Sequence, residues 1–560
     1  MKLTGAEIII RTLIEQGTTD VFGYPGGQVI NIYDALYKYQ DEINHVLTAH
    51  EQGASHAADG YSRATGKVGV CIATSGPGAT NLVTGIATAM LDSIPMVAIT
   101  GNVPCSLIGK DSFQEIDITG VTLPITKHNY FINRIEDLAD SIREAFQIAK
   151  SGRPGPVLVD VPKDIQVATY EYEPQPIVEK VPLPKAKEEQ IEEAVKLVNE
   201  AKRPYIYIGG GAAGLGLGDE VVELANKIDA CIGCSFMGLS AVPDGCDRFL
   251  GMQGMHGHYA SSMAQNEADL IIGVGVRFSD RATGNVSKFA KKSKIIQLDP
   301  DFAEINKNVR VDIGIVADVE DSFKRIASAC EAKSNPEWIA RVEQLKNEEA
   351  GFEAEIEKKS GDALTPKRIF DVINECKLPA TITVTDVGQH QMWAAQYSTF
   401  DRPRRFVSSG GLGTMGFGLG AAIGSFVATN DPTVLITGDG SFGMNLNELA
   451  TAVKYNLPVV IVLVNNGVLG MVRQWQNLFF GGRFSNTVLD RQTDFVKLAE
   501  AFGAVGYRAT TKEEFRSAFE QAVRCGRPVL IDTIIDKDEM VLPMLPPGGS
   551  IDDIITNVEK

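Results

Sequence analysis

The stretch VLITGDGSFGMNLNELATAVKYNLPVVIVLVNN, residues 434–466, contains two short apolar runs that each end in polar residues. Residues 434–437 lead into Gly438-Asp439-Gly440-Ser441, and residues 459–464 end at Asn465-Asn466. The residues between the two runs have helical spacing. Apolar, β-branched strands that alternate with helices are typical of parallel sheets covered on both faces. The stretch therefore predicts a strand-helix-strand unit of an α/β fold.

The same alternation extends along the rest of the chain. Further apolar runs that end in Gly- or Asp-rich turns lie at residues 68–73, 96–100, 157–161, 205–208, 270–274 and 381–385. Two segments have the composition of linkers: residues 171–187 are rich in proline and charge, and residues 334–365 are charged and helical in pattern. We therefore expect three α/β domains, each with a mainly parallel sheet flanked by helices, at residues 1–180, 185–335 and 365–560.

The composition excludes several classes of protein. The chain has 560 residues, of which 44% are hydrophobic and 22% charged, close to the mean for globular proteins. Its net charge of −18 argues against nucleic-acid binding. The N-terminus has no signal-peptide pattern, and no segment is long and apolar enough to span a membrane. The eight scattered cysteines form no disulfide framework. We therefore expect a cytoplasmic protein without a membrane span, with reduced and buried thiols.

The two polar turns in residues 434–466 have the chemistry of a metal and phosphate site. Both follow strands, and open α/β sheets bind ligands at the carboxyl ends of their strands. A carboxylate from Asp439, an amide oxygen from Asn466 and a backbone carbonyl would suit Mg²⁺. Gly440 and Ser441 can offer backbone N–H groups to a diphosphate at a helix start. Taken alone, the same residues also fit two ordinary surface turns.

Gly438-Asp439-Gly440, followed after 25 residues by Asn466, resembles the diphosphate-binding motif of thiamine-diphosphate-dependent enzymes. The resemblance implies that the side chains of Asp439 and Asn466 bind Mg²⁺ together with the carbonyl of Val468. It also identifies Glu51 as the glutamate that this family needs. A carboxylate bonded to the cofactor's N1′ favours the imino tautomer that activates the thiazolium, while the cofactor carries the carbanion chemistry.

The same resemblance assigns further contacts to thiamine diphosphate. Met415 would support the bent cofactor, and Gly413 would contact its pyrimidine. The residues implied for cofactor binding, besides the metal ligands and Glu51, are Gly388, Gln389, His390, Gly413, Met415, Gly438, Gly440, Ser441 and Met471.

Over essentially the whole chain, the sequence resembles the catalytic subunits of the acetohydroxyacid synthase (acetolactate synthase) family. Residues 470–475 read GMVRQW, and in that family the tryptophan, here Trp475, narrows the acceptor pocket and favours 2-ketobutyrate over pyruvate. By the same resemblance, Phe113 and Gln114 line the substrate pocket and Lys163 lies near its channel. Gln114 and Lys163 are therefore candidate catalytic residues beside Glu51. A local positive charge would attract a carboxylate substrate to this acidic protein.

The middle domain resembles the FAD-binding domain of that family, in which the flavin is structural. Ser279 stands where the family usually has an aspartate, and Gly481-Gly482 replaces a bulkier pair after Trp475. The residues implied for FAD binding are Arg153, Gly209, Gly210, Gly211, Met255, His256, Gly257, Gly275, Arg277, Asp280, Arg281, Asp299 and Asp318.

The resemblance implies a complete activity and a set of partners. The enzyme would decarboxylate pyruvate on thiamine diphosphate and join the remaining two carbons to pyruvate or 2-ketobutyrate. That reaction is the first common step of branched-chain amino-acid synthesis. The family places its sites between the first domain of one subunit and the third of another, which implies at least a homodimer, and it uses a small regulatory subunit. Residues 542–549 resemble its C-terminal tail, which covers the site. The alternatives are a flavin-independent catabolic acetolactate synthase, or a related 2-keto acid decarboxylase or oxidase.

Overall fold

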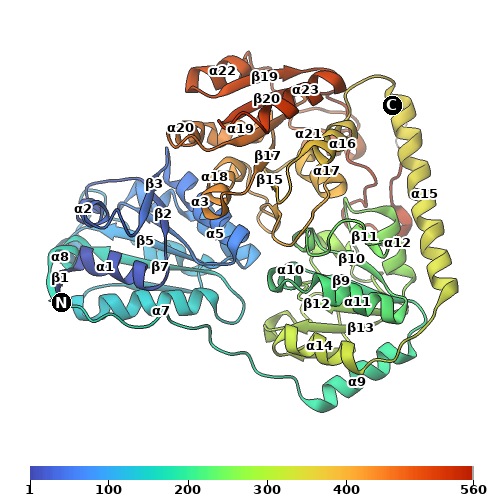
Figure 1. Ribbon diagram of the computed structural model, residues 1–560, viewed down its shortest axis with the longest axis horizontal. Helices are drawn as coiled ribbons and strands as arrows, with labels where there is room; N and C mark the ends of the chain where they lie inside the picture. Colours follow the sequence, from blue (N-terminus) through green and yellow to red (C-terminus); the bar gives the residue numbers. More distant parts are fainter. Residues whose placement is uncertain (558–560) are drawn as a thin grey trace.

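The computed structural model describes residues 1–557 and contains three six-stranded parallel sheets, each flanked by helices (Figure 1). In Figure 1 the first domain is blue, the middle domain green and the third domain orange to red. The predicted fold class is confirmed. The proposed domain boundaries stay predictions.

The first sheet has the order β3 (Asn44–Leu47), β2 (Asp20–Gly23), β4 (Gly69–Ala73), β5 (Met96–Asn102), β7 (Pro156–Pro162) and β6 (His128–Phe131). Its helices are α1 (Gly5–Glu15), α2 (Ile30–Lys38), α3 (Glu51–Thr65), α4 (Pro77–Thr80), α5 (Val83–Asp92), α6 (Ile118–Thr122), α7 (Leu138–Lys150) and α8 (Lys163–Val167). An antiparallel ribbon joins β1 (Lys2–Thr4) to β8 (Thr169–Glu171). Thr4 and Glu7 form a capping box, which explains why α1 begins at Gly5.

The middle sheet has the order β11 (Phe249–Met252), β10 (Cys231–Cys234), β9 (Pro204–Ile208), β12 (Leu270–Val274), β13 (Lys294–Asp299) and β14 (Ile313–Val316). Its helices are α9 (Glu188–Glu200), α10 (Gly210–Leu215), α11 (Gly218–Ile228), α12 (Tyr259–Glu267), α13 (Asp280–Thr283) and α14 (Val319–Ala329). The charged segment expected to be helical is α15 (Pro336–Ser360), which runs along one side of the molecule (Figure 1).

The third sheet has the order β16 (Phe406–Val407), β15 (Ile382–Thr385), β17 (Thr433–Gly438), β18 (Val459–Asn465), β20 (Val529–Ile534) and β19 (Val505–Ala509). Its helices are α16 (Pro366–Cys376), α17 (Gln389–Tyr397), α18 (Phe417–Thr429), α19 (Asp439–Asn445), α20 (Leu449–Lys454), α21 (Gly470–Phe479), α22 (Phe495–Phe502) and α23 (Lys512–Ala522). When strands are counted in chain order within each sheet, the first and third sheets have the same order.

Helices α3 and α18 join the first domain to the third along a glycine-lined contact. A Cβ on Gly60 would lie 2.2 Å from the carbonyl oxygen of Ala421, and one on Gly424 would lie 1.8 Å from that of Ala57. Only glycine allows the two backbones to approach this closely. One hydrophobic cluster also includes buried residues of both domains. Because α3 begins with Glu51, this contact fixes the position of that residue relative to the third domain.

All eight strands predicted from apolar runs are present, with ends within two residues of the expected ones. All eight cysteines are free, as expected, but the expectation of burial is right only for Cys71, Cys231, Cys234 and Cys330. The other four are partly exposed because they lie at element ends and in loops. Within residues 1–557 no helix is long and apolar enough to cross a membrane.

Candidate active site

The Gly-Asp-Gly turn lies where the strand order of the third sheet reverses, between β15 and β17. Ligands of open α/β sheets bind at such points, beyond the carboxyl ends of the strands. The Ser441 hydroxyl donates to the carbonyl of Val387, 2.6 Å away, so the turn after β17 is tied to the turn after β15. A Cβ on Gly438 would lie 2.8 Å from Nδ1 of His390. The structure therefore brings these two predicted cofactor turns together.

Asp439 opens α19 and is only 6% exposed. Burial raises the pKa of its carboxyl group to about 6, although its own N–H and that of Gly440 favour the charged form. The charge of Arg491 also favours the ionised form of Asp439. Because a buried carboxylate is costly unless it is paired with a cation, the surroundings of Asp439 suit a bound metal ion. Within residues 1–557 no group of three or more His, Cys, Asp or Glu side chains could hold a metal. The expected set is of another kind, with one carboxylate, one amide and one carbonyl.

Asn466, just beyond β18, completes this edge of the sheet. Its Nδ2 donates to Oε1 of Gln389 at 3.3 Å, and its Oδ1 accepts the N–H of Val468 at 3.2 Å. The ring of His390 is buried, which lowers its pKa to about 3, and its Nε2 has no hydrogen-bond partner in the described chain. A buried, neutral imidazole whose ring nitrogen has no partner fits a site in which a polar ligand would bond to that nitrogen. Met471 lies next to this edge, in the first turn of α21.

The loop of residues 408–416 carries Gly413 and Met415. Asp386 holds its end: Oδ1 of Asp386 accepts the N–H of Gly416 at 2.8 Å. Gly413 has a φ of +68°, and a Cβ placed there would meet only Val387, at 3.9 Å. The backbone at Gly413 thus faces open space, which fits close approach of a ligand. Sequence reasoning missed Asp386, although its position directly after the predicted strand of residues 381–385 was a signal that could have found it.

The predicted catalytic residues of the first domain lie around the loop that follows β4. Oε2 of Glu51 accepts a hydrogen bond from Asn81 at 3.0 Å, and a Cβ on Gly78 would lie 3.1 Å from its Oε1. The backbone of Gln114, with φ +61°, lies against Gly76 of the same loop. Lys163 begins α8 and donates to the carbonyl of Gly27, 3.1 Å away.

Phe113 is 84% exposed in the single chain. No hydrogen bond or ion pair within residues 1–557 joins Glu51 to the turns that carry Asp439 and Asn466. The two halves of the predicted site are therefore linked within the described chain by helix packing and by backbone contacts near Glu51, and not by a direct bond from the Glu51 side chain.

Glu448 is a further residue near Glu51 that sequence reasoning missed. It lies in the 3₁₀ turn η6 (Leu446–Glu448), is fully buried, and accepts the N–H groups of Ala49 and His50 at 3.1 and 2.9 Å. Burial raises its pKa, although its hydrogen bonds favour the charged form. The third domain therefore fixes the backbone just before Glu51.

The glycines predicted for FAD meet at the reversal point of the middle sheet, between β9 and β12. A Cβ on Gly209 would lie 2.0 Å from the carbonyl oxygen of Gly275, and one on Gly275, with φ +56°, would lie 2.7 Å from the N–H nitrogen of Ala212. These turns can pack only as glycines. Gly210 and Gly211 open α10, where the N–H of Gly211 already donates to the carbonyl of Gly275 at 3.1 Å.

Two predicted flavin residues connect the middle domain to the first. Arg153 donates to Oε1 of the buried Glu304 at 2.6 Å, and Arg277 donates to the carbonyl of Leu91 at 2.7 Å. Asp299 ends β13, and burial raises its pKa to about 6. The side chain of Asp318 accepts the N–H of Asp321 and caps α14, so this helix cap by itself explains an aspartate at this position.

A second group of predicted flavin residues lies against the third domain. Nη1 of Arg281 lies 3.2 Å from the sulfur of Met255, and its guanidinium lies 5.8 Å from the ring centroid of Trp475. His256 is buried, which lowers its pKa to about 4, and its Nδ1 has no partner in the described chain; Gly257 follows it in a tight turn. Nε1 of Trp475 likewise has none. These unpaired polar atoms fit a site completed by a ligand.

Asp280 differs from this group because its side chain is exposed, and two departures from the family pattern, at Ser279 and at Gly481-Gly482, lie in loops or at a helix start. Asp280, the first residue of α13, has an 85% exposed side chain, which forms an ion pair with Arg281 at 3.8 Å. Ser279, where the family has an aspartate, is the cap residue of the same helix. Gly481 and Gly482 both adopt positive φ, near +59° and +68°, which a bulkier pair would adopt only with strain.

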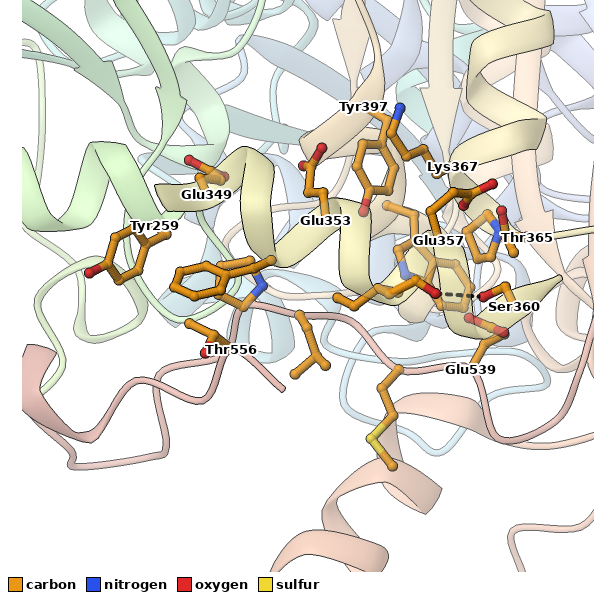
Figure 2. A pocket seen from close by; sticks show the side chains of 17 residues that line it. Tyr259, Glu349, Glu353, Glu357, Ser360, Thr365, Lys367, Tyr397, Glu539 and Thr556 are labelled. Carbon is orange, nitrogen blue, oxygen red and sulfur yellow. Dashed lines mark hydrogen bonds between the residues drawn. The ribbon is translucent and has the colours of Figure 1, made fainter. Parts of the chain in front are cut away.

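A cleft away from these sites lies between α15 and the C-terminal segment (Figure 2). Its walls include Glu349, Glu353, Tyr397 and Pro543. The segment that closes it also contacts the middle domain, because the N–H of Leu545 donates to the carbonyl of Met255 at 2.7 Å. The tail of residues 542–549 thus packs against Met255, one of the predicted flavin residues.

The chain matches three protein families that together cover most of its length. They are the thiamine pyrophosphate enzyme N-terminal TPP binding domain (residues 3–121), central domain (residues 191–326) and C-terminal TPP binding domain (residues 386–533). The fold and the two halves of the site therefore define a thiamine-pyrophosphate-dependent enzyme.

Similar whole chains narrow this class. The "Probable acetolactate synthase large subunit" of Methanocaldococcus jannaschii is 46% identical over 99% of this chain and 95% of its own. The "Acetolactate synthase large subunit" of Corynebacterium glutamicum is 45% identical over 99% and 90%. The "Acetolactate synthase isozyme 3 large subunit" of Escherichia coli is 42% identical over 99% and 98%. The chain belongs to the family of acetolactate synthase large subunits.

Proposed function

We propose that the chain forms 2-acetolactate from two pyruvate molecules, or 2-aceto-2-hydroxybutyrate from pyruvate and 2-ketobutyrate, in branched-chain amino-acid synthesis. The observation that carries the proposal is the buried Asp439 carboxylate beside Asn466 and His390, at the reversal point of the third sheet. Family membership supports the reaction. Bound thiamine diphosphate supplies the carbon–carbon bond chemistry when held at this edge.

The residues of the third domain would hold the cofactor. Asp439, Asn466 and the Val468 carbonyl would bind Mg²⁺, which prefers oxygen ligands and keeps positions for phosphate and water. Gly413 leaves room for the pyrimidine, and Met415 would support the bent cofactor from the same loop. The residues that would surround the diphosphate are Gly388, Gln389, His390, Gly438, Gly440, Ser441 and Met471.

Glu51 would act from a partner subunit, where its carboxylate would hold a proton at the cofactor's N1′. This proposal is supported by the hydrogen bond of Glu51 to Asn81 of its own domain, since within residues 1–557 no hydrogen bond or ion pair joins its side chain to Asp439. Exposed apolar side chains beside both halves also favour a homodimer: Phe113 is 84% exposed, and Val472 is 53% exposed. Gln114 and Lys163 would complete this half of the site, and a lone subunit would be inactive.

The substrate side would be formed by Arg281 and Trp475. Arg281 places a positive charge against the Trp475 ring, where it can attract a carboxylate into an acidic protein. Trp475 would then narrow the acceptor position. Once carbon dioxide has left, water must be excluded, and the tail packed on Met255 would contribute to this.

FAD would bind in the middle domain with a structural role. The interlocked glycines at the sheet reversal and the unpaired Nδ1 of His256 support this assignment. The relatives are named large subunits, which supports a small regulatory partner for this chain as well. A cytoplasmic location agrees with these proposals.

The decisive test is acetolactate formation from pyruvate, with Mg²⁺ and thiamine diphosphate, on flavin-stripped protein before and after FAD is added. We expect activity only after FAD is restored. Full activity without FAD would assign the catabolic, flavin-independent enzyme instead. Acetaldehyde without acetolactate would indicate a decarboxylase. No turnover with all cofactors bound would refute the synthase proposal.

A further inference from the structure

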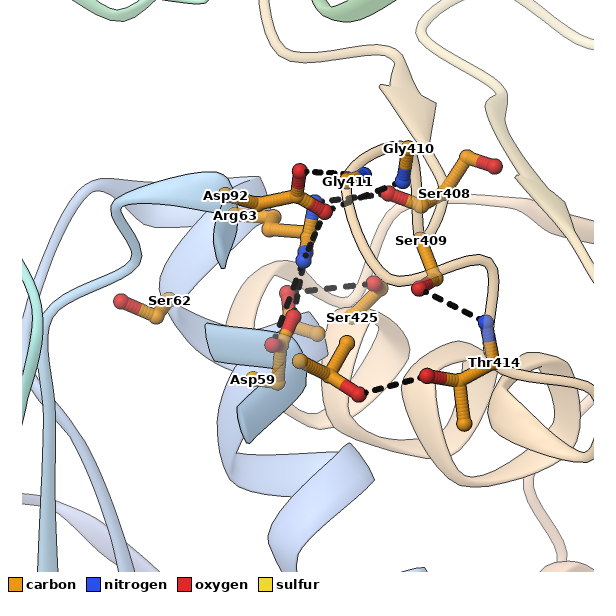
Figure 3. Close-up of polar contacts among 12 residues, drawn as sticks. Asp59, Ser62, Arg63, Asp92, Ser408, Ser409, Gly410, Gly411, Thr414 and Ser425 are labelled. Atoms are coloured by element: carbon orange, nitrogen blue, oxygen red, sulfur yellow. Dashed lines mark hydrogen bonds and ion pairs between the residues drawn. The ribbon is translucent and has the colours of Figure 1, made fainter. Parts of the chain in front are cut away.

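The loop of residues 408–416 is fixed by a buried charge cluster of the first domain, formed by Asp59, Arg63 and Asp92 (Figure 3). The side chains of Arg63 and Asp92 are 4% and 0% exposed and pair at 2.9 Å. Arg63 also contacts Asp59, one turn earlier on α3. The cluster thus contains two carboxylates and one guanidinium, shielded from water.

The carboxylate of Asp92 accepts two hydrogen bonds from the backbone of this loop. Oδ2 accepts the N–H of Gly410 at 3.0 Å, and Oδ1 accepts the N–H of Gly411 at 2.7 Å. A Cβ on Gly411 would lie 2.8 Å from Oδ1, so the contact requires glycine. Hydrogen bonds to an ionised acceptor are stronger than those between neutral groups, which makes this a firm attachment.

Two further bonds, from Arg63 and from Thr88, join the first domain to the same loop, and a third bond lies within the loop itself. Nη1 of Arg63 donates to the carbonyl of Ser408 at 2.7 Å. The hydroxyls of Thr88 and Thr414 lie 2.7 Å apart, and the N–H of Thr414 donates to Ser409 at 3.1 Å. The first domain therefore fixes the loop at both ends of the 408–414 stretch, directly before Met415.

We propose that Asp92, with Arg63, is a positioning residue for the cofactor loop of its own chain. Its bonds to Gly410 and Gly411 set the place at which Gly413 and Met415 meet thiamine diphosphate. This rests on the proposed function for the cofactor contacts of those two residues. In the proposed dimer, each first domain would then serve two sites: its Glu51 acts on the partner's cofactor, while its Asp92 shapes the loop for the cofactor of its own third domain.

The test compares Asp92→Asn with a matched control, Glu15→Gln. The asparagine presents an NH₂ group to one of the two glycine N–H groups, yet leaves Arg63 paired with Asp59, so the cluster becomes neutral and the fold should tolerate it. Glu15 forms a mostly buried pair with Arg143 at 2.8 Å, with each side chain 7% exposed, inside the first domain and away from the loop. We measure thiamine diphosphate binding by titration calorimetry in the presence of Mg²⁺, and amide hydrogen exchange of the cofactor-free protein.

We expect Asp92→Asn to weaken thiamine diphosphate binding about tenfold or more, since one charge-assisted contact is replaced by a repulsive one. Exchange at Gly410 and Gly411 should be faster even without cofactor, while Glu15→Gln changes neither readout. Unchanged exchange at the two glycines, or equal weakening by both variants, would overturn the proposal.

If Asp92→Asn does not fold, Thr88→Val and Thr88→Ser provide the test. The valine should weaken binding several-fold and the serine should restore it; equal binding by the two would overturn the proposal. Wild-type protein that binds no thiamine diphosphate would refute the proposed function, whereas the exchange experiment would still decide whether Asp92 fixes the loop.

Discussion

The α3–α18 contact gives a quantitative prediction about the Gly424→Ala variant. The added methyl would lie 1.8 Å from the carbonyl oxygen of Ala57, whereas real Cβ atoms essentially never come closer than 3.0 Å to another heavy atom. The two helices must therefore separate by at least about 1.2 Å, in an interior that has little free volume. Overpacking of this kind costs about 1–3 kcal/mol, and we expect the upper end because the obstacle is backbone.

The Gly424→Ala variant should also lose activity while it is still folded, because α3 begins with Glu51 and its displacement moves that residue. A displacement of about 1 Å can cost ~100-fold in rate when it misplaces a reacting group. We would measure the first thermal transition, since three domains need not unfold in one step. A loss of ~3 kcal/mol corresponds to a decrease of roughly 6–12 °C for a domain of this size.

Gly351→Ala is the matched control. Gly351 lies inside α15, and apart from its chain neighbours and its own helix backbone, no atom of residues 1–557 lies within 4 Å of a Cβ placed there. Alanine is favoured over glycine in a helix by up to ~1 kcal/mol, so this variant should be as stable as wild type or slightly more so. If the first thermal transition and the activity of Gly424→Ala equal those of wild type, the two helices can accommodate the methyl group, and the reasoning is wrong.

Three further predictions concern specificity, the position of Glu51 and acid stability. Trp475→Leu should shift products toward acetolactate several-fold in a competition between pyruvate and 2-ketobutyrate; an unchanged ratio removes Trp475 from the acceptor pocket. Glu448→Gln should lower kcat about tenfold while thiamine diphosphate affinity stays within about threefold, because it disturbs only the backbone before Glu51; a large loss of affinity with kcat intact would contradict this. Burial opposes ionisation of Glu15, but hydrogen bonds from Arg143 and others lower its pKa from 4.5 to about 2. Its contribution to stability is therefore complete above pH 4.5 and is lost as the pH falls toward 2, so Glu15→Gln should flatten acid unfolding over that range.

The sequence predicted the fold class because its signals are local. Strands such as β12 and β18 are continuous apolar runs of β-branched residues that end in Gly or Asn, and each can be read within a few positions. Inner strands such as β13, which includes Lys294 and Gln297, were not predicted, nor were the edge strands β19, which is largely half-exposed, and β16, which has only two residues. Their pairing with β20 and β15 depends on the rest of the sheet.

Some residues of the candidate site could be predicted from local sequence, and others could not. Asp439 and Asn466 follow neighbouring strands, so a motif of fixed spacing identifies them, and Glu51 follows from the same resemblance. Asp92 and Glu448 could not be found in this manner. Asp92 meets Gly410 from 318 residues away, and Glu448 meets His50 from 398 residues away.

The sequence by itself thus determined the α/β class, the ends of the eight predicted strands and the chemistry that follows some of those ends. Only the tertiary structure decided which buried carboxylates hold the cofactor loop and the backbone before Glu51. The physical reason is that strand formation and turn chemistry depend on neighbours along the chain, whereas a buried carboxylate is stabilised by whatever donors the packing of distant helices brings to it.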